Sequence, residues 1–212
     1  MKHLLMDSEY ASMGRWISVV VAREYGMTLY ERGDLLKLLG DPSLTEERLN
    51  ALDALLANAT IEDLKANQEF LAVQHLLDRA IEKALSAGPC IIHECAASRL
   101  VPREESLRVM LYNTSLEHKV VRAYGDPLGC GKDASEEEAI AFMRREDRKR
   151  AAYHDALIPS SWGMKEGYDL CLDSDVLGRE KCAEVLIEAL RDPRLSADKA
   201  RSIIETRFAQ VQ

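Results

Sequence analysis

Short apolar runs alternate with longer helical stretches along this chain of 212 residues, and that alternation constrains its fold more than any other feature. Each run is bounded by turn or helix signals, and the runs cover residues 3–6, 27–30, 90–93, 107–112 and 168–172. Strands interleaved with helices form a parallel sheet that is covered on both faces. The pattern therefore predicts an α/β fold with a five-stranded parallel sheet flanked by helices, in a single domain spanning residues 1–212.

The stretch between the second and third runs predicts a helical insertion at residues 43–88, because Leu, Ala, Glu and Lys dominate it. A capping box at residues 43–46 opens its first helix, and Thr60 opens a second helix that ends at Gly88. The sequence leaves two interpretations open. The helical pair either only packs against the sheet or also covers a bound ligand.

A second capping box, at residues 135–138, begins a basic helix that must end before Pro159. Within it, residues 144–150 place Asp147 among five Lys and Arg side chains. A solvated basic face is one interpretation. The other is binding of a polyphosphate, because bidentate guanidinium contacts suit phosphate oxygens. Two C-terminal helices, separated at Asp192, complete the predicted chain.

Charge and cysteine usage narrow the class of protein. A formal net charge of -8 disfavours sequence-independent binding of nucleic acid, which needs Lys and Arg to neutralise phosphates. The five cysteines lack CxxC spacing, and Cys90 and Cys171 lie in apolar runs that resemble core strands, as is typical of a reducing compartment. No apolar run approaches the roughly 18 residues of a membrane-spanning helix, and the first run is too short for a signal peptide. We therefore expect a cytoplasmic protein without a nucleic-acid or membrane partner.

Residues 7–15 join the first run to the first predicted helix, which follows Ser12 and ends at Gly26. Such a loop is a natural phosphate cradle, because exposed backbone N–H groups and a helix N-terminus both attract anions. This loop lacks the GxxxxGK[ST] pattern, so a plain strand-to-helix turn is the alternative interpretation. The histidines are scattered without metal-ligand spacing, and no metal-binding residue is predicted.

Four segments are similar, in the same order, to blocks of one known family. The segment SEYASMGR is similar to a Ser-Arg-x-Tyr-Gly-Ser-Gly-Gly-Arg loop, TLYERGDLL to a Tyr-Asp-Arg-Glu turn, and TSLEHKVVR to an Ala-Pro-Leu-Glu-x-Arg-Ile-x-Arg lid. The segment DRKRAAYH, followed by SSWGMKEGYDLCLDSDVLG, is similar to an Asp-x-x-Arg-x-x-Tyr-Tyr…Trp-Gly…Tyr-Asp-Leu…Gly ending. On these motifs the chain resembles the cytidylate kinase-like family of P-loop nucleotide kinases over nearly its whole length, with a divergent phosphate-binding loop.

The resemblance implies a P-loop NTPase-like fold, ATP with Mg²⁺ as the phosphate donor, and CMP, dCMP or a related small nucleotide as the acceptor. It also implies that the insertion at residues 43–88 covers the acceptor and that residues 114–158 form a basic helical lid. The positions that it assigns to the donor phosphates are Ser12, Met13, Gly14 and Arg15. Those that it assigns to the acceptor are Arg32, Glu94, Asp147 and Arg150. It assigns catalysis to Arg15, Lys119, Arg122 and Arg150. Catalysis of phosphoryl transfer depends chiefly on alignment and positive charge.

Several positions depart from the family pattern. Ser8 replaces an Arg of the family loop, and Ala11 and Met13 replace glycines whose backbone φ angle is expected to be positive. After the third strand the family's Gly-Arg pair appears as His93 and Glu94. A carboxylate there opposes an acceptor phosphate by about 1 to 4 kcal/mol, for charges ~4 Å apart at an effective dielectric constant between about 80 and 20.

Two functions of different class follow. The first is an ATP-dependent nucleotide kinase, a phosphotransferase of weak activity, which the basic lid favours. The second is a catalytically degenerate kinase fold that only binds a ligand or a protein partner, which the substitutions at Ala11, Met13 and Glu94 favour.

Overall fold

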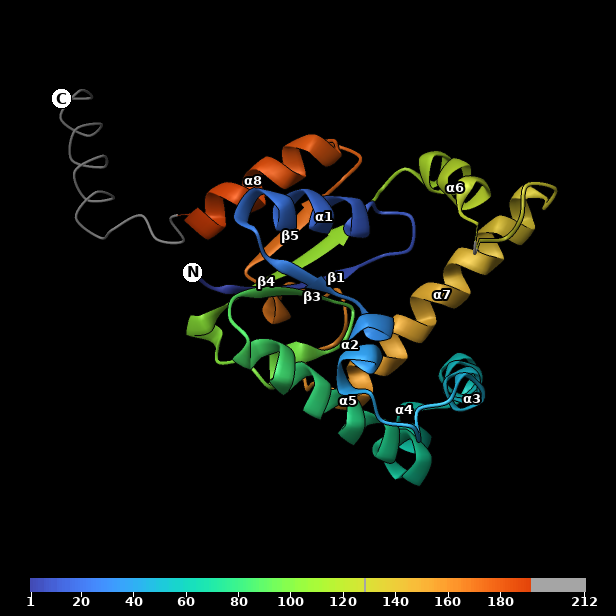
Figure 1. Cartoon of the computed structure of the whole chain (residues 1–212). Helices are drawn as coiled ribbons and strands as arrows, with labels where there is room; N and C mark the ends of the chain where they lie inside the picture. The colour runs from blue at the N-terminus through green and yellow to red at the C-terminus, as the bar shows by residue number, and fades with distance from the viewer. Residues whose placement is uncertain (128, 192–212) are drawn as a thin grey trace.

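The computed structural model describes residues 1–127 and 129–191 and contains a five-stranded, fully parallel sheet of order β2-β3-β1-β4-β5 (Figure 1). The strands are β1 (His3–Ser8), β2 (Thr28–Tyr30), β3 (Cys90–His93), β4 (Ser106–Tyr112) and β5 (Leu170–Asp173). The predicted five-stranded parallel α/β fold is confirmed, and the predicted strand bounds differ from these by at most two residues. The order places β1 at the centre, so the loop that follows it opens at the middle of the sheet's carboxyl edge.

Helices cover both faces of the sheet, with α1 and α8 on one face and α5 on the other (Figure 1). The helices are α1 (Gly14–Tyr25), α2 (Arg32–Leu39), α3 (Glu46–Asn58), α4 (Ile61–Ala66), α5 (Gln68–Ser86), α6 (Leu116–Gly125), α7 (Glu136–Leu157) and α8 (Arg179–Arg191). Neighbouring strand residues point to opposite faces, which explains why the central strands carry apolar residues on both faces. Leu4 and Ile91 pack in the cluster with α1 and α8, whereas Leu5 and Ile92 pack in the cluster with α5.

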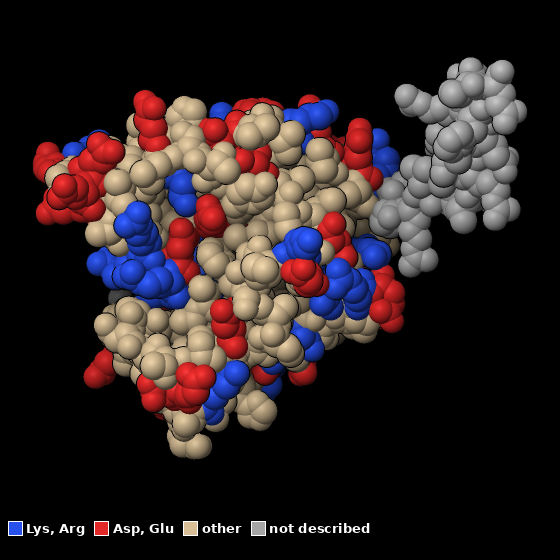
Figure 2. All heavy atoms as spheres, turned by 180° about the vertical axis from the view of Figure 1, so that it is seen from behind, with Lys and Arg blue, Asp and Glu red and all other residues tan. Residues whose placement is uncertain are grey.

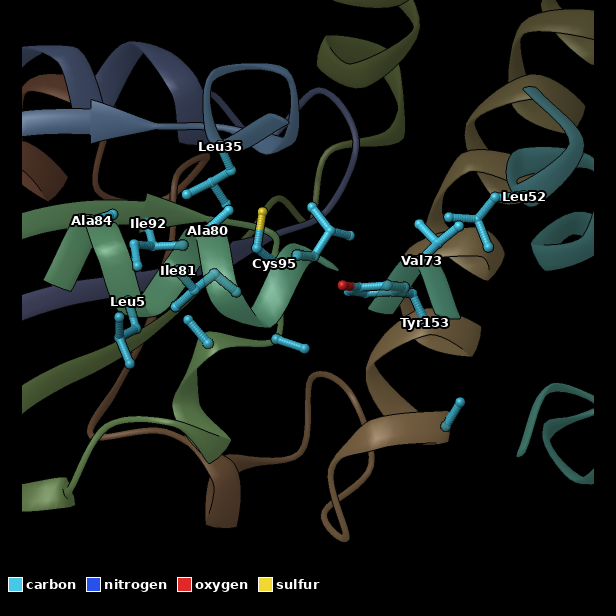
Figure 3. Packing of buried hydrophobic residues seen from close by; sticks show 14 of the residues in the cluster. Leu5, Leu35, Leu52, Val73, Ala80, Ile81, Ala84, Ile92, Cys95 and Tyr153 are labelled. Carbon is cyan, nitrogen blue, oxygen red and sulfur yellow. The ribbon is translucent and has the colours of Figure 1, made fainter. Parts of the chain in front are cut away.

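The core on the α5 side extends away from the sheet and holds α7 in place. Figure 3 shows Ala80, Ile81 and Ala84 of α5 beside Leu5 and Ile92 of the sheet, with Tyr153 of α7 at the far end of the cluster. The Tyr153 ring also meets Phe70 edge to face, with a ring-centroid distance of 6.2 Å. This packing fixes the C-terminal half of α7, while its N-terminal half packs against α6 around Met143.

The insertion at residues 43–88 contains three helices, not the predicted pair. Asn67 breaks the stretch, because its backbone is extended and its side chain accepts the N–H of Phe70 to begin α5. The predicted capping box at residues 43–46 is wrong. Ser43 is engaged with Asp41 in the preceding turn, and Thr45 caps α3 instead. The box predicted at Ser135 is confirmed. Thr60 opens a helix as predicted, and it also forms a capping box with Asp63, which was not predicted.

Three further differences concern single segments. The sequence interpretation missed α2, an eight-residue helix whose one buried residue is Leu35 and which ends at Gly40 with a φ of 66°. Cys171 lies in a strand as predicted, but it is exposed, because β5 is the edge strand. The last predicted helix, beyond Asp192, lies outside the described residues. In the part of the chain that is described, no helix combines the length and the apolar character needed to span a bilayer.

We expect Phe70→Ala to lower the free energy of unfolding by about 3 to 5 kcal/mol, because Phe70 is fully buried between α5 and α7 and its truncation leaves a cavity. Leu71→Ala is the matched control, since Leu71 follows it on the same helix with 41% of its surface exposed. Urea unfolding followed by circular dichroism measures both values. Equal losses in the two variants would contradict this account of the core.

Candidate functional site

The loop between β1 and α1 has a strained backbone. Ala11 and Met13 adopt φ angles of 62° and 71°, in the left-handed region that glycine favours. The expectation that these positions require a positive φ is confirmed, and each non-glycine residue there costs about 1 kcal/mol or more. The loop keeps this conformation without glycine, so contacts from the rest of the structure must hold it.

The N-terminus of α1 presents a row of backbone donors. In the described structure the N–H groups of residues 13–16 have no hydrogen-bond acceptor, and Ile17 is the first to bond, to the carbonyl of Met13. Unpaired N–H groups and the positive end of the helix dipole together attract anions. A side chain at Gly14 would place a Cβ 2.5 Å from Ser8 Oγ, so only glycine fits at this close approach.

Ser12, predicted to hold donor phosphates, is turned into the loop. It is fully buried, and its hydroxyl donates to the Glu9 carbonyl at 2.8 Å. Its backbone N–H also bonds to that carbonyl, at 3.2 Å. In this structure Ser12 therefore stabilises the turn, and the unpaired N–H groups belong to the residues that follow it.

Two cavities open beside this loop. The larger, here called the loop cavity, has a volume of about 650 Å³ and is lined by the loop, the start of α1 and Arg122 of α6. The smaller, here called the helix cavity, has a volume of about 440 Å³ and is lined by Arg32, Asp53 and residues of α7. Both cavities are lined by the same junction residues, namely Arg15, Glu31, His93, Glu94 and Arg150.

The predicted site residues line one or both of these cavities, with two exceptions. Arg15, Arg122 and Arg150 line the loop cavity, as do Ser12, Met13 and Gly14. Arg32 lines the helix cavity, where it forms a bidentate pair with Asp53 at 2.7 and 3.0 Å. Lys119 and Asp147 line neither cavity.

Lys119 of α6 and Asp147 of α7 support the loop. Lys119 Nζ lies 2.9 Å from a carboxylate oxygen of Glu9 and 3.5 Å from one of Asp147. Asp147 Oδ1 accepts the backbone N–H of Tyr10 at 2.6 Å. Burial raises the pKa of Asp147, against the opposing effects of the Tyr10 N–H and of Lys119. An internal carboxylate thus holds a loop N–H, and Arg122 donates to the Ala11 carbonyl at 2.8 Å.

Lys and Arg side chains gather on the side of the molecule where α7 lies, with Asp and Glu among them (Figure 2). At the junction the cations and the carboxylates lie next to each other. Arg15 lies 3.2 Å from Glu31, and Arg150 lies 3.1 Å from Glu94. His93 lies between the carboxylates, 3.5 Å from Glu31 and 3.2 Å from Glu94. Each junction cation therefore has an internal carboxylate partner.

The charges of His93 and Glu94 stabilise each other. Burial alone would lower the pKa of His93, but the Glu94 charge and the hydrogen bonds of both carboxylates raise it to about 9. Burial alone would raise the pKa of Glu94, but His93, Arg150 and the Ser8 hydroxyl lower it to about 2. Ser8 Oγ donates to Glu94 Oε1 at 2.6 Å and lies 3.0 Å from His93 Nε2. At neutral pH, His93 is a cation and Glu94 an anion.

Sequence reasoning assigned Glu94 to the acceptor and also marked it as a departure from the family pattern. It identified His93 only as such a departure, and it missed Glu31 and Asp53 altogether. The available signal for Glu31 was its position directly before Arg32, in the turn after the second strand. Asp53 gave no local signal, because it meets Arg32 only through the packing of α3. Among the described residues, no group of three or more His, Cys, Asp or Glu side chains is arranged to hold a metal ion.

We expect His93 to titrate near pH 9 in the folded protein, above its ordinary value of about 6.5. Because the folded-state pKa is raised, the stability that it contributes is fully present below about pH 6.5 and is lost as pH rises through about 9. Between pH 6 and pH 10, the wild type should lose roughly 3 kcal/mol more unfolding free energy than His93→Gln. NMR titration of the imidazole and urea unfolding at both pH values measure these quantities. Titration of His93 below pH 7 would contradict the ion-pair geometry.

The sequence model of the cytidylate kinase-like family matches residues 6–176, from β1 to the connection between β5 and α8. No curated protein sequence matches the chain. An uncharacterized protein from Eubacterium ventriosum has a similar structure, with a TM-score of 0.66 and 15% identity over 91% of this chain and 99% of that one. A shikimate kinase from Bacteroides thetaiotaomicron has a TM-score of 0.52 and 12% identity over 90% of this chain and 99% of that one. At these identities the structures support a shared fold, that of P-loop kinases.

Proposed function

We propose that this chain, which belongs to the cytidylate kinase-like family, is an ATP-dependent phosphotransferase that moves the terminal phosphate to a small acceptor. The family makes a nucleoside monophosphate such as CMP or dCMP the first acceptor to test. One observation carries the proposal. Residues 13–16, whose backbone N–H groups are unpaired, line a cavity of about 650 Å³ that is also lined by Arg122 and Arg150.

The residues that line the loop cavity suit the phosphates of ATP, the proposed donor. Phosphoryl transfer requires little covalent chemistry from the protein and depends on alignment and positive charge around the moving group. The α1 N-terminus supplies oriented donors, and Arg122 has only a backbone carbonyl as its hydrogen-bond partner among the described residues. Exchange of that neutral partner for a phosphate oxygen gains a charge-assisted hydrogen bond.

The residues at the start of α1 do not provide the hydroxyl ligand that Mg²⁺ has in a P-loop. In GxxxxGK[ST] that hydroxyl follows the basic residue, whereas here Trp16 follows Arg15. The nearby Ser12 hydroxyl is engaged with the Glu9 carbonyl. Mg²⁺ is therefore proposed only as an ion carried on the ATP phosphates, and no catalytic step is assigned to it.

The internal ion pairs support a second candidate function, a non-catalytic kinase fold that binds a ligand or a partner. Each junction cation has a carboxylate within 3.5 Å, and Asp147 holds the Tyr10 N–H. These contacts stabilise the site without a nucleotide. Binding of ATP is common to both functions, whereas turnover distinguishes them.

We expect Arg122→Ala to raise the Kd for ATP by about 10-fold, because it removes a charge-assisted contact from the loop cavity. Arg144→Ala is the control. Arg144 is exposed on α7, lines neither cavity and has no ion pair among the described residues. Isothermal titration calorimetry with ATP and Mg²⁺ measures both. An unchanged Kd in Arg122→Ala, or no ATP binding by the wild type, would exclude the loop cavity as the donor site.

Met13→Gly should raise the rate of ADP release, from a wild-type rate below the roughly 1 to 100 per second usual for kinases. Met13 lines the loop cavity with a φ of 71°, so glycine relieves backbone strain and frees room for phosphates. Steady-state ADP release with CMP and other small acceptors is the measurement. If both proteins bind ATP and neither releases ADP, the non-catalytic function replaces the enzyme.

A further inference from the structure

The balance of charge at the junction between the two cavities depends on His93. The junction cations are Arg15, His93 and Arg150, and the junction carboxylates are Glu31 and Glu94. Positive charge is therefore in excess while the His93 ring is protonated. Loss of that proton leaves the two arginines against the two carboxylates, and the excess disappears.

His93 lies against the start of α1, where the unpaired N–H groups are. A Cβ on Gly14 would lie only 2.9 Å from His93 Nε2, closer than a side-chain carbon packs. The His93 side chain is buried, with 6% of its surface exposed. A protonated imidazole here adds a full charge to the partial positive charge of the helix N-terminus.

We propose that His93 is a positioning residue for the phosphates of ATP, and that the charge of its protonated ring raises the affinity of the α1 N-terminus for them. The inference rests on the proposed phosphotransferase function and adds a residue to its donor site. His93 acts through space, because both of its ring nitrogens are engaged within the protein. Nδ1 lies 3.5 Å from Glu31, while Nε2 lies 3.2 Å from Glu94 and 3.0 Å from Ser8 Oγ.

The basic residue of the loop itself is less firmly placed. In GxxxxGK[ST] the Lys after the last glycine reaches the phosphates, and Arg15 has that position in this chain. The Arg15 side chain is 77% exposed, and its Nε lies 3.2 Å from Glu31. His93, by contrast, is a cation fixed inside the protein before any ligand binds. Preorganised charge of this kind needs no rearrangement when the phosphates arrive.

Charged groups face His93 from each element around it: Asp7 on β1, Glu31 after β2, Glu94 after β3 and Arg150 on α7. The two glutamates raise the pKa of His93 to about 9, and Arg150 opposes them. The affinity for phosphates should therefore be high below pH 9 and fall as pH rises through it. Burial also raises the pKa of Asp7, so a variant that lacks only His93 is needed to separate the two groups.

Calorimetric titration with ATP and Mg²⁺ at pH 7.5 and pH 9.5 tests the inference. The terminal phosphate titrates at about pH 6, so its own charge changes little over this range. If neutral His93 binds ATP roughly 10-fold more weakly, the wild-type Kd should rise about 3-fold between the two pH values. His93→Gln should bind about 10-fold more weakly at pH 7.5, with a Kd that pH leaves unchanged. His75→Gln is the matched control, because His75 is exposed on α5 and lines neither cavity.

A second measurement uses the wild type alone and stands even if His93→Gln does not fold. Because linkage is reciprocal, a ligand that binds the protonated form 10-fold more tightly should raise the pKa of His93 from about 9 to roughly 10. NMR titration of the imidazole with and without saturating ATP measures this change. A purely structural role for His93 predicts no such response to ATP.

A wild-type Kd that does not change with pH would overturn the inference, as would a His93 pKa that ATP leaves in place. The same pH dependence in His93→Gln would also overturn it, because the titrating group would then be another one. In each of these cases ATP still binds, so the proposed phosphotransferase function is unaffected. Absence of ATP binding at both pH values would remove that function and this inference together.

Discussion

The ion pair between buried His93 and half-buried Glu94 is the interaction on which the arrangement of the site depends. A buried charge is costly unless it is paired and hydrogen-bonded, so each group holds the other in its ionised form. Their remaining partners come from separate parts of the chain: Ser8 ends β1, Glu31 follows β2 and Arg150 lies on α7. Removal of any one partner leaves charge uncompensated in the junction. The relative positions of these elements are therefore coupled through one electrostatic network.

The same network explains how strained backbone is maintained. Glu94 has a φ of 61°, and Ala11 and Met13 have similar values, although none of them is glycine. Strained residues persist where surrounding contacts overdetermine their conformation. At Glu94 the side-chain pairs and the backbone bond to Met6 provide those contacts, and in the loop the Arg122 bond to the Ala11 carbonyl does so. The family pattern relies on glycine at two of these positions, and this chain relies on tertiary contacts instead.

The sequence predicted the sheet because strands buried on both faces are continuous apolar runs, and those runs survive as strands with small shifts of boundary. It missed α2, whose eight residues are too few for a sustained apolar period and include one buried residue, Leu35. It predicted one helix where Asn67 separates two, since a single cap inside a helical pattern gives little signal. The cations of the site followed from the resemblance to the family's motifs. Their carboxylate partners did not, because pairs such as Glu31 with His93 join segments far apart in the sequence and depend on the sheet order.

Helix α7 contributes residues to both cavities. Glu146, Lys149 and Tyr153 line the helix cavity at a spacing of three to four residues, which is one face of a helix. Arg150 lies between them and lines both cavities, and it donates to the Ser8 carbonyl at 2.9 Å. Because the C-terminal half of α7 is held by the core, a ligand that displaces Arg150 in one cavity changes the charge offered in the other. If the proposed function holds, donor and acceptor share the Arg150 side chain, and coupling between them requires no hinge between domains.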